Sequence, residues 1–194
     1  MSRNKEKNEL LTKQKKSEIL FTATRLFAQK GYQGVSVSDI SKTLKISQGI
    51  IFWYFETKEN LFKAAFMEEF KAIKLAASSI LSDSALSPGE KLQKLISEML
   101  KVYHEKKEGC MLILQLLSNK EMQQILSIDI LSVYEELYHE LEVLFKDAGA
   151  RNPELKARNF VALLDGFMIQ IILGLDIGNY EMLVKDILKR YELL

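Results

Sequence analysis

Residues 35–61 decide the fold, and they read VSVSDISKTLKISQGIIFWYFETKENL. This stretch predicts two short helices, at 36–44 and 47–55, joined by a tight connection at 45–46. Two short helices joined by a turn, behind a longer first helix, form a helix-turn-helix. The stretch therefore predicts a compact three-helix module.

Capping residues set the boundaries of these helices. Ser36 begins the first short helix, and Asp39 follows three residues later, where a carboxylate lies near the positive helix end. Ser47 is predicted to cap the second short helix. Thr57 is predicted to cap a long fourth helix that runs from residue 58 to about residue 81.

The helix before this pair is predicted at about 12–30. Apolar residues recur at helical spacing from Ile19 to Phe27, and Gly31 follows the last turn as a helix end should. Residues 1–14 are polar and are predicted to form a flexible basic arm.

The core of the module determines which side of the 47–55 helix stays outside. The predicted core residues are apolar and come from all three helices: Ile19, Ala23, Phe27, Val37, Ile40, Leu44, Ile46, Ile51 and Phe55. The outward face then carries an amide, a glycine and large apolar groups: Gln48, Gly49, Ile50, Phe52, Trp53 and Tyr54. Such a surface favours contact with the bases and phosphates of duplex DNA. The alternative is that the aromatic run is the core of an ordinary helix bundle.

The distribution of charge agrees with a module that binds a polyanion. The net charge is only +1, but residues 1–61 carry 11 Lys/Arg against 6 Asp/Glu, whereas residues 62–194 carry 16 against 20. A basic head on a mildly acidic body indicates a nucleic-acid-binding module joined to a second region. A solvated lysine-rich terminus is the alternative explanation.

The segment from Gly31-Tyr32 through residues 35–40 and 46–61 resembles the DNA-binding domain of the tetracycline-repressor (TetR) family of transcriptional regulators. The family pattern has Gly-Tyr/Phe after helix one, a Thr/Ser-rich start to helix two, and Val-Ser-x-Gly-x-Leu-Tyr-x-x-Phe followed by Lys-Glu. The match covers about residues 15–65. The resemblance implies a dimeric regulator, usually a repressor, that binds an inverted-repeat operator in double-stranded DNA and responds to a small-molecule effector.

Carried over by position, the resemblance also implies DNA-contacting residues. Those expected to face base edges are Gln48, Gly49 and Phe52. Those expected along the phosphates are Trp53, Tyr54 and Lys58, with Ser36 and Ser38 donating from the second helix. Gly49 suits a close approach of the helix to the duplex, and Lys58 adds an ammonium to a helix N-terminus that already attracts anions.

Three positions depart from the family pattern. Lys45 stands where the turn usually has glycine, which costs about 1 kcal/mol if its φ is positive. Ile50 replaces the usual Thr or Ser and offers an apolar contact, for example to a thymine methyl group. Phe52 replaces the usual Tyr and removes one hydroxyl.

The rest of the sequence predicts an all-α body. A break at 82–89 precedes helices predicted at about 89–106, 109–118, 121–148, 153–175 and 179–193, about nine helices in total. The predicted domains are a helix-turn-helix domain at 1–56 and a helical effector-binding and dimerisation domain at 57–194. The long fourth helix joins them.

Two C-terminal segments are candidates for a dimer interface. Residues 161–174 are apolar nearly all round and must be covered on every side. Four residues recur there every fourth position, namely Ala162, Gly166, Gln170 and Gly174. The last helix offers a second apolar face that includes Leu183, Ile187 and Tyr191. As the resemblance implies, we expect these two helices to pair with their copies in a homodimer; the alternative is an intramolecular core helix.

An effector pocket is expected among the helices between 89 and 175. The candidate lining residues are apolar or aromatic with scattered polar groups: Tyr103, Met111, Gln115, Tyr134, Tyr138, Phe167 and Met168. Together they favour a largely apolar small molecule, although each alone fits a core position.

Several classes of protein are disfavoured. The lone Cys110 excludes an intramolecular disulfide and suits a reducing compartment. The apolar stretch 160–178 is broken by Asp165 and Asp176, so no membrane span is expected. Together these observations predict a cytoplasmic protein. The sequence has no Gly-rich phosphate loop, nucleophile elbow or zinc motif, so neither an enzyme nor a cofactor or metal site is expected. A ligand-independent DNA-binding protein is the closer alternative, but in such a protein the long C-terminal region would have no function.

Overall fold

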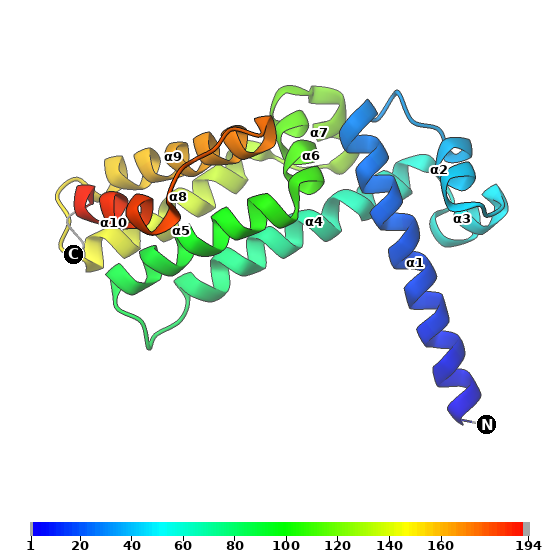
Figure 1. The fold of residues 1–194 in the computed structure, drawn as a ribbon, viewed down its shortest axis with the longest axis horizontal. Helices are drawn as coiled ribbons and strands as arrows, with labels where there is room; N and C mark the ends of the chain where they lie inside the picture. Colours follow the sequence, from blue (N-terminus) through cyan, green and yellow to red (C-terminus); the bar gives the residue numbers. More distant parts are fainter. Residues whose placement is uncertain (1, 192–194) are drawn as a thin grey trace. The chain divides into compact units, whose positions relative to one another are not determined.

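The computed structural model describes residues 2–191, together with the side chains of residues 11–191 other than Ala72 and Ile130. Every element in this range is an α-helix, which confirms the all-α prediction (Figure 1). The helices are α1 (Ser2–Lys30), α2 (Val37–Leu44), α3 (Gln48–Phe55), α4 (Lys58–Leu81), α5 (Pro88–Glu105), α6 (Lys107–Ser118), α7 (Lys120–Leu126), α8 (Ile130–Asp147), α9 (Pro153–Leu173) and α10 (Tyr180–Arg190). None of these helices is both long and apolar enough to cross a membrane.

By packing, the chain divides into two compact units. The first unit comprises Met1–Phe70 and Met111–Ser127, and the second comprises Lys71–Cys110 and Ile128–Leu194. The first half of α4, most of α6 and all of α7 therefore belong with the N-terminal helices. This division differs from the predicted boundary after residue 56, which followed the end of the helix-turn-helix.

Helix α1 begins at Ser2, ten residues before the predicted start near residue 12. The added stretch is polar and lacks the apolar periodicity on which the prediction relied. However, residues 2–12 contain neither glycine nor proline, and Lys, Glu, Arg and Leu within it are good helix formers. Absence of a buried face does not end a helix that has no residue to stop it.

The single helix predicted at 121–148 is instead two helices, α7 and α8. Ser127 ends α7 in the left-handed conformation, with φ 52°. Asp129 then caps α8 by accepting hydrogen bonds from the Leu131 backbone N–H (3.1 Å) and the Ser132 hydroxyl (2.8 Å). A short polar residue at each side of the break supplies the cap and the turn that a continuous helix would lack.

The core of the first unit is built around aromatic side chains. Phe27 of α1 meets Phe62 of α4 edge to face with ring centroids 5.1 Å apart, and Tyr32 lies 4.9 Å from the same Phe62 ring. The Gln115 amide of α6 donates to the Ala28 carbonyl at 2.8 Å. Helices α1, α4 and α6 thereby form the scaffold on which α2 and α3 pack.

The second unit is a bundle in which α9 packs against α5 and α8, while α10 packs against α5 (Figure 1). One end of its core is an aromatic cluster in which Tyr191 stacks on Phe145 with ring centroids 5.2 Å apart. Phe160 of α9 contacts both rings edge to face. Lys74 of α4 pairs with Glu136 of α8 at 2.7 Å on the surface of the same unit.

Candidate DNA-binding surface

The start of α2 is fixed by a reciprocal capping box, as the sequence predicts. The Ser36 hydroxyl accepts from the Asp39 backbone N–H at 3.1 Å. In return, one Asp39 carboxylate oxygen accepts from the Ser36 backbone N–H at 2.8 Å and from its hydroxyl at 2.6 Å. These hydrogen bonds lower the pKa of Asp39 below its ordinary value. The hydroxyl expected to donate to phosphate is therefore engaged with a carboxylate in the protein itself.

The turn between α2 and α3 passes through a left-handed residue. Lys45 has φ 54° and ψ 42°, the positive φ at which the lysine-for-glycine departure carries its cost. The Lys45 N–H donates to Lys42 at 3.2 Å and the Ile46 N–H donates to Ser41 at 3.0 Å. This pair of bonds ends α2 sharply and sets the direction in which α3 leaves.

Helix α3 presents the outward face that the sequence predicts. Ile51 and Phe55 are buried, whereas Trp53 is 73% exposed, Phe52 43% and Ile50 38%. Gln48 and Gly49 are exposed at the first turn. The aromatic run is therefore not the core of an ordinary bundle. In the predicted core, Leu44 and Ile46 are only half-buried.

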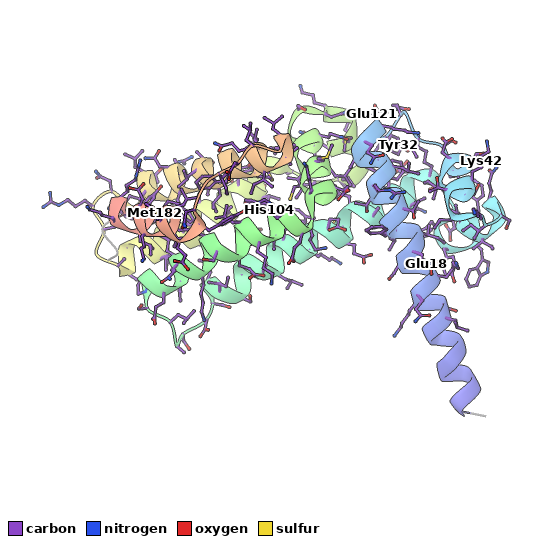
Figure 2. The ribbon with its side chains drawn as sticks, viewed as in Figure 1. Glu18, Tyr32, Lys42, His104, Glu121 and Met182 are labelled. Atoms are coloured by element: carbon purple, nitrogen blue, oxygen red, sulfur yellow. The ribbon has the colours of Figure 1, made fainter. Side chains whose placement is uncertain are left out.

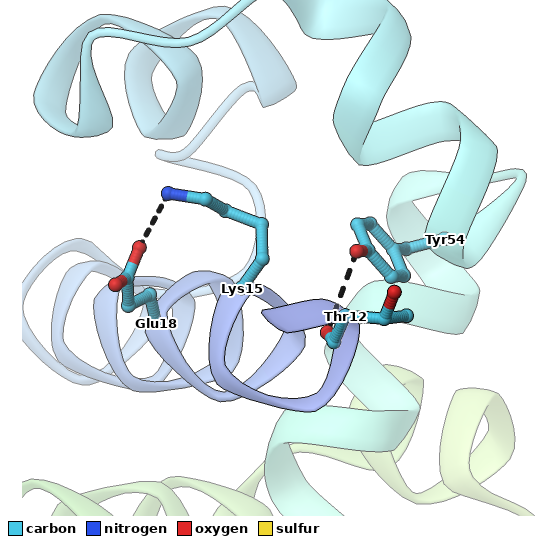
Figure 3. A network of polar contacts seen from close by, with 4 residues as sticks. All are labelled: Thr12, Lys15, Glu18 and Tyr54. Atoms are coloured by element: carbon cyan, nitrogen blue, oxygen red, sulfur yellow. Dashed lines mark hydrogen bonds and ion pairs between the residues drawn. The ribbon is translucent and has the colours of Figure 1, made fainter. Parts of the chain in front are cut away.

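Tyr54 differs from its exposed neighbours on α3. Its side chain is half-buried, and its hydroxyl donates to the Thr12 carbonyl of α1 at 3.4 Å (Figure 3). Beside it on α1, Lys15 pairs with Glu18, and Lys16 lies over the Phe55 ring at 5.7 Å. Tyr54 thus connects α3 with the early part of α1.

Gly49 is not required by the fold. A Cβ placed on this residue would meet only the Ser47 hydroxyl oxygen, at 3.8 Å, which is an ordinary van der Waals distance. Its φ is not in the positive range that favours glycine. The fold itself therefore has room for a side chain at this point of the exposed face.

The N-cap of α3 differs from the prediction in its chemistry. Ser47 occupies the N-cap position, but its side chain makes no capping hydrogen bond. The N–H groups at the start of α3 are consequently not satisfied by that hydroxyl, and uncapped N–H groups at a helix start attract anions. The sequence did not single out the Ser47 side chain, because a serine in this position ordinarily signals a cap.

A γ-turn at Glu56 separates α3 from α4. Glu56 has φ 63° and ψ −45°, and the Thr57 N–H donates across it to the Phe55 carbonyl at 2.6 Å. Thr57 then caps α4 as predicted, with its hydroxyl accepting from the Asn60 N–H at 3.0 Å. The strained turn was not predicted, because glutamate carries no signal for a positive φ.

Lys58, expected along the phosphates, lies against an aromatic ring. Its ammonium is 4.2 Å from the centroid of the Tyr32 ring, and partial burial lowers its pKa. Lys42 is exposed on α2, and Figure 2 labels it together with Tyr32. Ser38, the second donor expected on α2, is half-buried, and its carbonyl accepts from the Ser41 hydroxyl at 2.9 Å.

The residues predicted to line an effector pocket do not all lie in one unit. Met111 and Gln115 belong to the first unit, and the Gln115 amide is used in its core. The others belong to the second unit: Tyr103, Phe167 and Met168 are buried there, and Tyr134 and Tyr138 are half-buried.

Asp165 joins these residues without having been predicted among them. The Tyr134 hydroxyl donates to its carboxylate at 3.0 Å. In the sequence this aspartate stands only as an interruption of an apolar stretch, which gives no signal for a site. Two surface hollows of the second unit are lined by other residues, one along α9 and α10 and one along α4 and α5.

The predicted dimer residues separate into exposed and buried groups. Ala162, Gln170 and Gly174 are exposed along α9, and a Cβ placed on Gly166 would meet nothing within 4 Å. Leu183 is half-buried. By contrast, Ile187 and Tyr191 are buried in the core of their own unit, so their assignment to an interface is corrected.

The arrangement around the two histidines is not that of a metal site. His104 on α5 (Figure 2) contacts the Tyr180 hydroxyl at the start of α10. Among the residues whose side chains are described, no three His, Cys, Asp or Glu lie together in a way that holds a metal ion.

Comparisons with known proteins agree on the N-terminal helices. The sequence pattern described as "Bacterial regulatory proteins, tetR family" matches residues 19–65. The chain is 51% identical over 49 residues to the HTH-type transcriptional regulator YuxN of Bacillus subtilis (strain 168), which covers 25% of this chain and 17% of that protein. The chain spans less than two thirds of the length of the curated relatives it matches.

Solved structures share the fold over most of the chain. A TetR-like transcriptional regulator from Rhodococcus sp. RHA1 matches with a TM-score of 0.75 and 19% identity, covering 90% of this chain and 93% of that chain. AibR, solved in complex with isovaleryl coenzyme A and operator DNA, matches with a TM-score of 0.65 and 17% identity, covering 90% and 96%. At these identities the likeness is one of fold.

Proposed function

We propose that the chain is a ligand-responsive repressor of the TetR family of transcriptional regulators. It binds an inverted-repeat operator as a homodimer and leaves the operator when a small effector binds. It acts in the cytoplasm and has no enzymatic activity.

The exposed face of α3 is the observation on which this proposal rests. Ile51 and Phe55 anchor the helix, while Trp53 and Phe52 stand in solvent on the opposite side. A two-turn helix held by one side and bare on the other suits insertion in the major groove, which is about 12 Å wide. Gly49 lets the helix axis come close to the base edges.

The exposed stripe of α9 supports the homodimer. Ala162, Gln170 and Gly174 are accessible, and Gly166 has open space above it. Small residues on one helix face let a second helix approach closely. A two-fold dimer carries two copies of α3, and therefore the operator is an inverted repeat whose half-sites lie about 34–36 Å apart.

An effector site in the second unit completes the proposal. AibR, which shares the fold, was solved with isovaleryl coenzyme A and operator DNA, so a chain of this architecture accommodates both kinds of partner. The half-buried tyrosines of α8 and the Asp165 carboxylate of α9 supply polar groups within an otherwise apolar bundle.

The test is DNA binding by a variant of Gly49. Gly49→Leu adds a side chain where the fold has room, so its thermal unfolding midpoint should not fall below that of the wild-type protein. In footprinting on DNA upstream of the protein's own gene, the wild-type chain should protect an inverted repeat. Gly49→Leu should bind at least tenfold more weakly, because its side chain would meet the duplex.

Phe21→Ala is the control, since Phe21 is 68% exposed on α1 and is not among the predicted contact residues. It should bind as the wild-type protein does. Equal affinity of the Gly49→Leu and wild-type proteins, or protection of no inverted repeat, would contradict the proposal.

Lys58 gives a second test of the DNA contact. Its ammonium rests on the Tyr32 ring at the first residue of α4. Lys58→Ala should weaken binding to all sequences alike and flatten the slope of log affinity against log salt by about one unit. Lys146→Ala, in the last turn of α8, should leave the slope unchanged. An unchanged slope in Lys58→Ala would remove this residue from the phosphate contacts.

A further inference from the structure

A carboxylate lies in the second unit without a positive partner. Asp165 is in the middle of α9 and is half-buried. It accepts one hydrogen bond, from the Tyr134 hydroxyl of α8 at 3.0 Å. Among residues 11–191, no lysine, arginine or histidine forms an ion pair with it.

Such a carboxylate is unusual in a helix bundle. An ionised carboxylate has about four acceptor positions, and a single neutral donor fills one of them. Burial raises the pKa of Asp165 above its ordinary value, and no neighbouring cation offsets this effect. A half-buried carboxylate with no cation beside it keeps acceptor positions for a partner from outside the chain.

One tyrosine contacts the carboxylate, and two other tyrosines lie in the same unit. Tyr134 and Tyr138 are one turn apart on α8 with ring centroids 5.8 Å apart, and both are half-buried. Tyr103 of α5 is 6% exposed, and burial together with the negative charge of Asp165 raises its pKa. The faces of aromatic rings attract cations.

The chain shows this preference at the neighbouring ring. The Arg158 guanidinium of α9 lies 4.8 Å from the centroid of the Tyr138 ring. Arg158 is also paired with Glu154 at 3.2 Å, so it does not neutralise Asp165. The cluster of Asp165, Tyr103, Tyr134 and Tyr138 therefore combines a half-buried carboxylate with aromatic rings.

We propose that this cluster is the recognition site for the effector and that the effector is an organic cation, an amine or amidine carried on an apolar body. The cationic group pairs with Asp165, and the tyrosine rings cover the apolar part. This inference rests on the proposed function and replaces the expectation, drawn from the sequence, of an effector recognised mainly by apolar contact.

The test uses three small probes of nearly equal shape and different charge: benzamidine, benzamide and benzoate. Each is titrated into the full-length protein without DNA and followed by calorimetry and thermal unfolding. Benzamidine should bind in the millimolar range and raise the unfolding temperature, because its amidinium forms two hydrogen bonds with one carboxylate. Benzamide should bind at least fivefold more weakly, and benzoate should not bind.

Variants separate the carboxylate from the fold. Asp165→Asn should lose at least fivefold in benzamidine affinity, whereas Asp147→Asn, at the exposed end of α8, should keep the wild-type affinity. Equal binding of benzamidine by Asp165→Asn and wild type, a preference for benzoate, or no binding of benzamidine would overturn the proposal.

The outcome is distinguishable from a failure of the proposed function. The probe titrations need no DNA, and the footprinting of Gly49→Leu needs no ligand. Binding of benzamidine through Asp165 together with failure to protect any inverted repeat would keep the cation site and reject the repressor. Protection of an inverted repeat, together with probe binding that is the same in Asp165→Asn and wild type, would keep the repressor and reject the cation site.

Discussion

Lys45 and Glu56 stand at the two ends of α3, and both have a positive φ that residues with a side chain rarely adopt. At Lys45 the left-handed conformation costs about 1–2 kcal/mol relative to glycine, partly offset by the greater entropy that glycine loses on folding. Lys45→Gly should therefore stabilise the protein by about 0.5–1 kcal/mol, measured as a rise in the midpoint of urea unfolding. Lys42→Gly, within α2, should destabilise it by a similar amount. A loss of stability in Lys45→Gly would contradict the strained geometry of this turn.

Asp165 gives a prediction of pH dependence at the same scale. Its folded-state pKa is raised above the ordinary value of 3.8 by burial. A carboxyl group whose pKa is raised on folding stabilises the protein at pH values below its unfolded-state pKa. This stabilisation is lost as the pH rises through the folded-state pKa. Asp165→Asn should therefore be more stable than the wild-type protein at pH 7, and the difference should shrink as the pH falls toward 4. A difference in unfolding temperature that stays constant from pH 4 to pH 7 would show that the carboxylate is not desolvated.

At the scale of the element, the caps of α2 and α3 look alike in the sequence and differ in the structure. The Ser36 hydroxyl accepts from the Asp39 N–H, whereas the Ser47 side chain makes no capping hydrogen bond. Ser36→Ala should destabilise the first unit by about 1 kcal/mol, because an N-cap serine loses that much on average. Ser47→Ala should change the unfolding free energy by no more than a few tenths of a kcal/mol. Equal losses in a pair of chemical denaturation curves would mean that the two serines cap equally.

The elements also show what a sequence reveals and what it conceals. The helix-turn-helix was predictable to within a residue, since its caps, turn and buried Ile51 and Phe55 all lie within one local stretch. The start of α1 was not, because residues 2–12 have no apolar face by which to recognise a helix. The break at Ser127 was missed because a serine, unlike a glycine, gives no signal in the sequence for a left-handed conformation. Local capping and turn residues could be identified from the sequence. The conformations that ordinary residues such as Ser127 adopt in the folded protein could not.

At the scale of the whole molecule, the residues available for a dimer interface are the apolar side chains that remain exposed after the protomer folds. The family resemblance assigned Ile187 and Tyr191 to the interface, but both are buried in the unit's own core, where Tyr191 packs against Phe145 and Phe160. Asp165 likewise gained significance only when α8 brought Tyr134 to it. A single sequence shows which faces are apolar, and only the fold shows which of them are already covered.

Gly166 tests the homodimer at this scale. A side chain there meets nothing within 4 Å in the protomer, so Gly166→Leu should leave the unfolding temperature of the protomer unchanged or raised. If α9 pairs closely with its copy, the added side chain should weaken dimerisation by at least tenfold in sedimentation equilibrium. Gln93→Leu, on the exposed side of α5, is the matched control and should dimerise as the wild-type protein does. A monomeric wild-type protein at micromolar concentration would refute the interface outright.

The room above Gly49 has a consequence for how this protein changes over generations. A residue that both determines a function and holds the fold puts both at risk when it is altered. At this position an added Cβ meets only one serine oxygen at an ordinary distance. A duplicated gene can therefore try new side chains here while its product still folds, and drift toward a different target sequence in a single step.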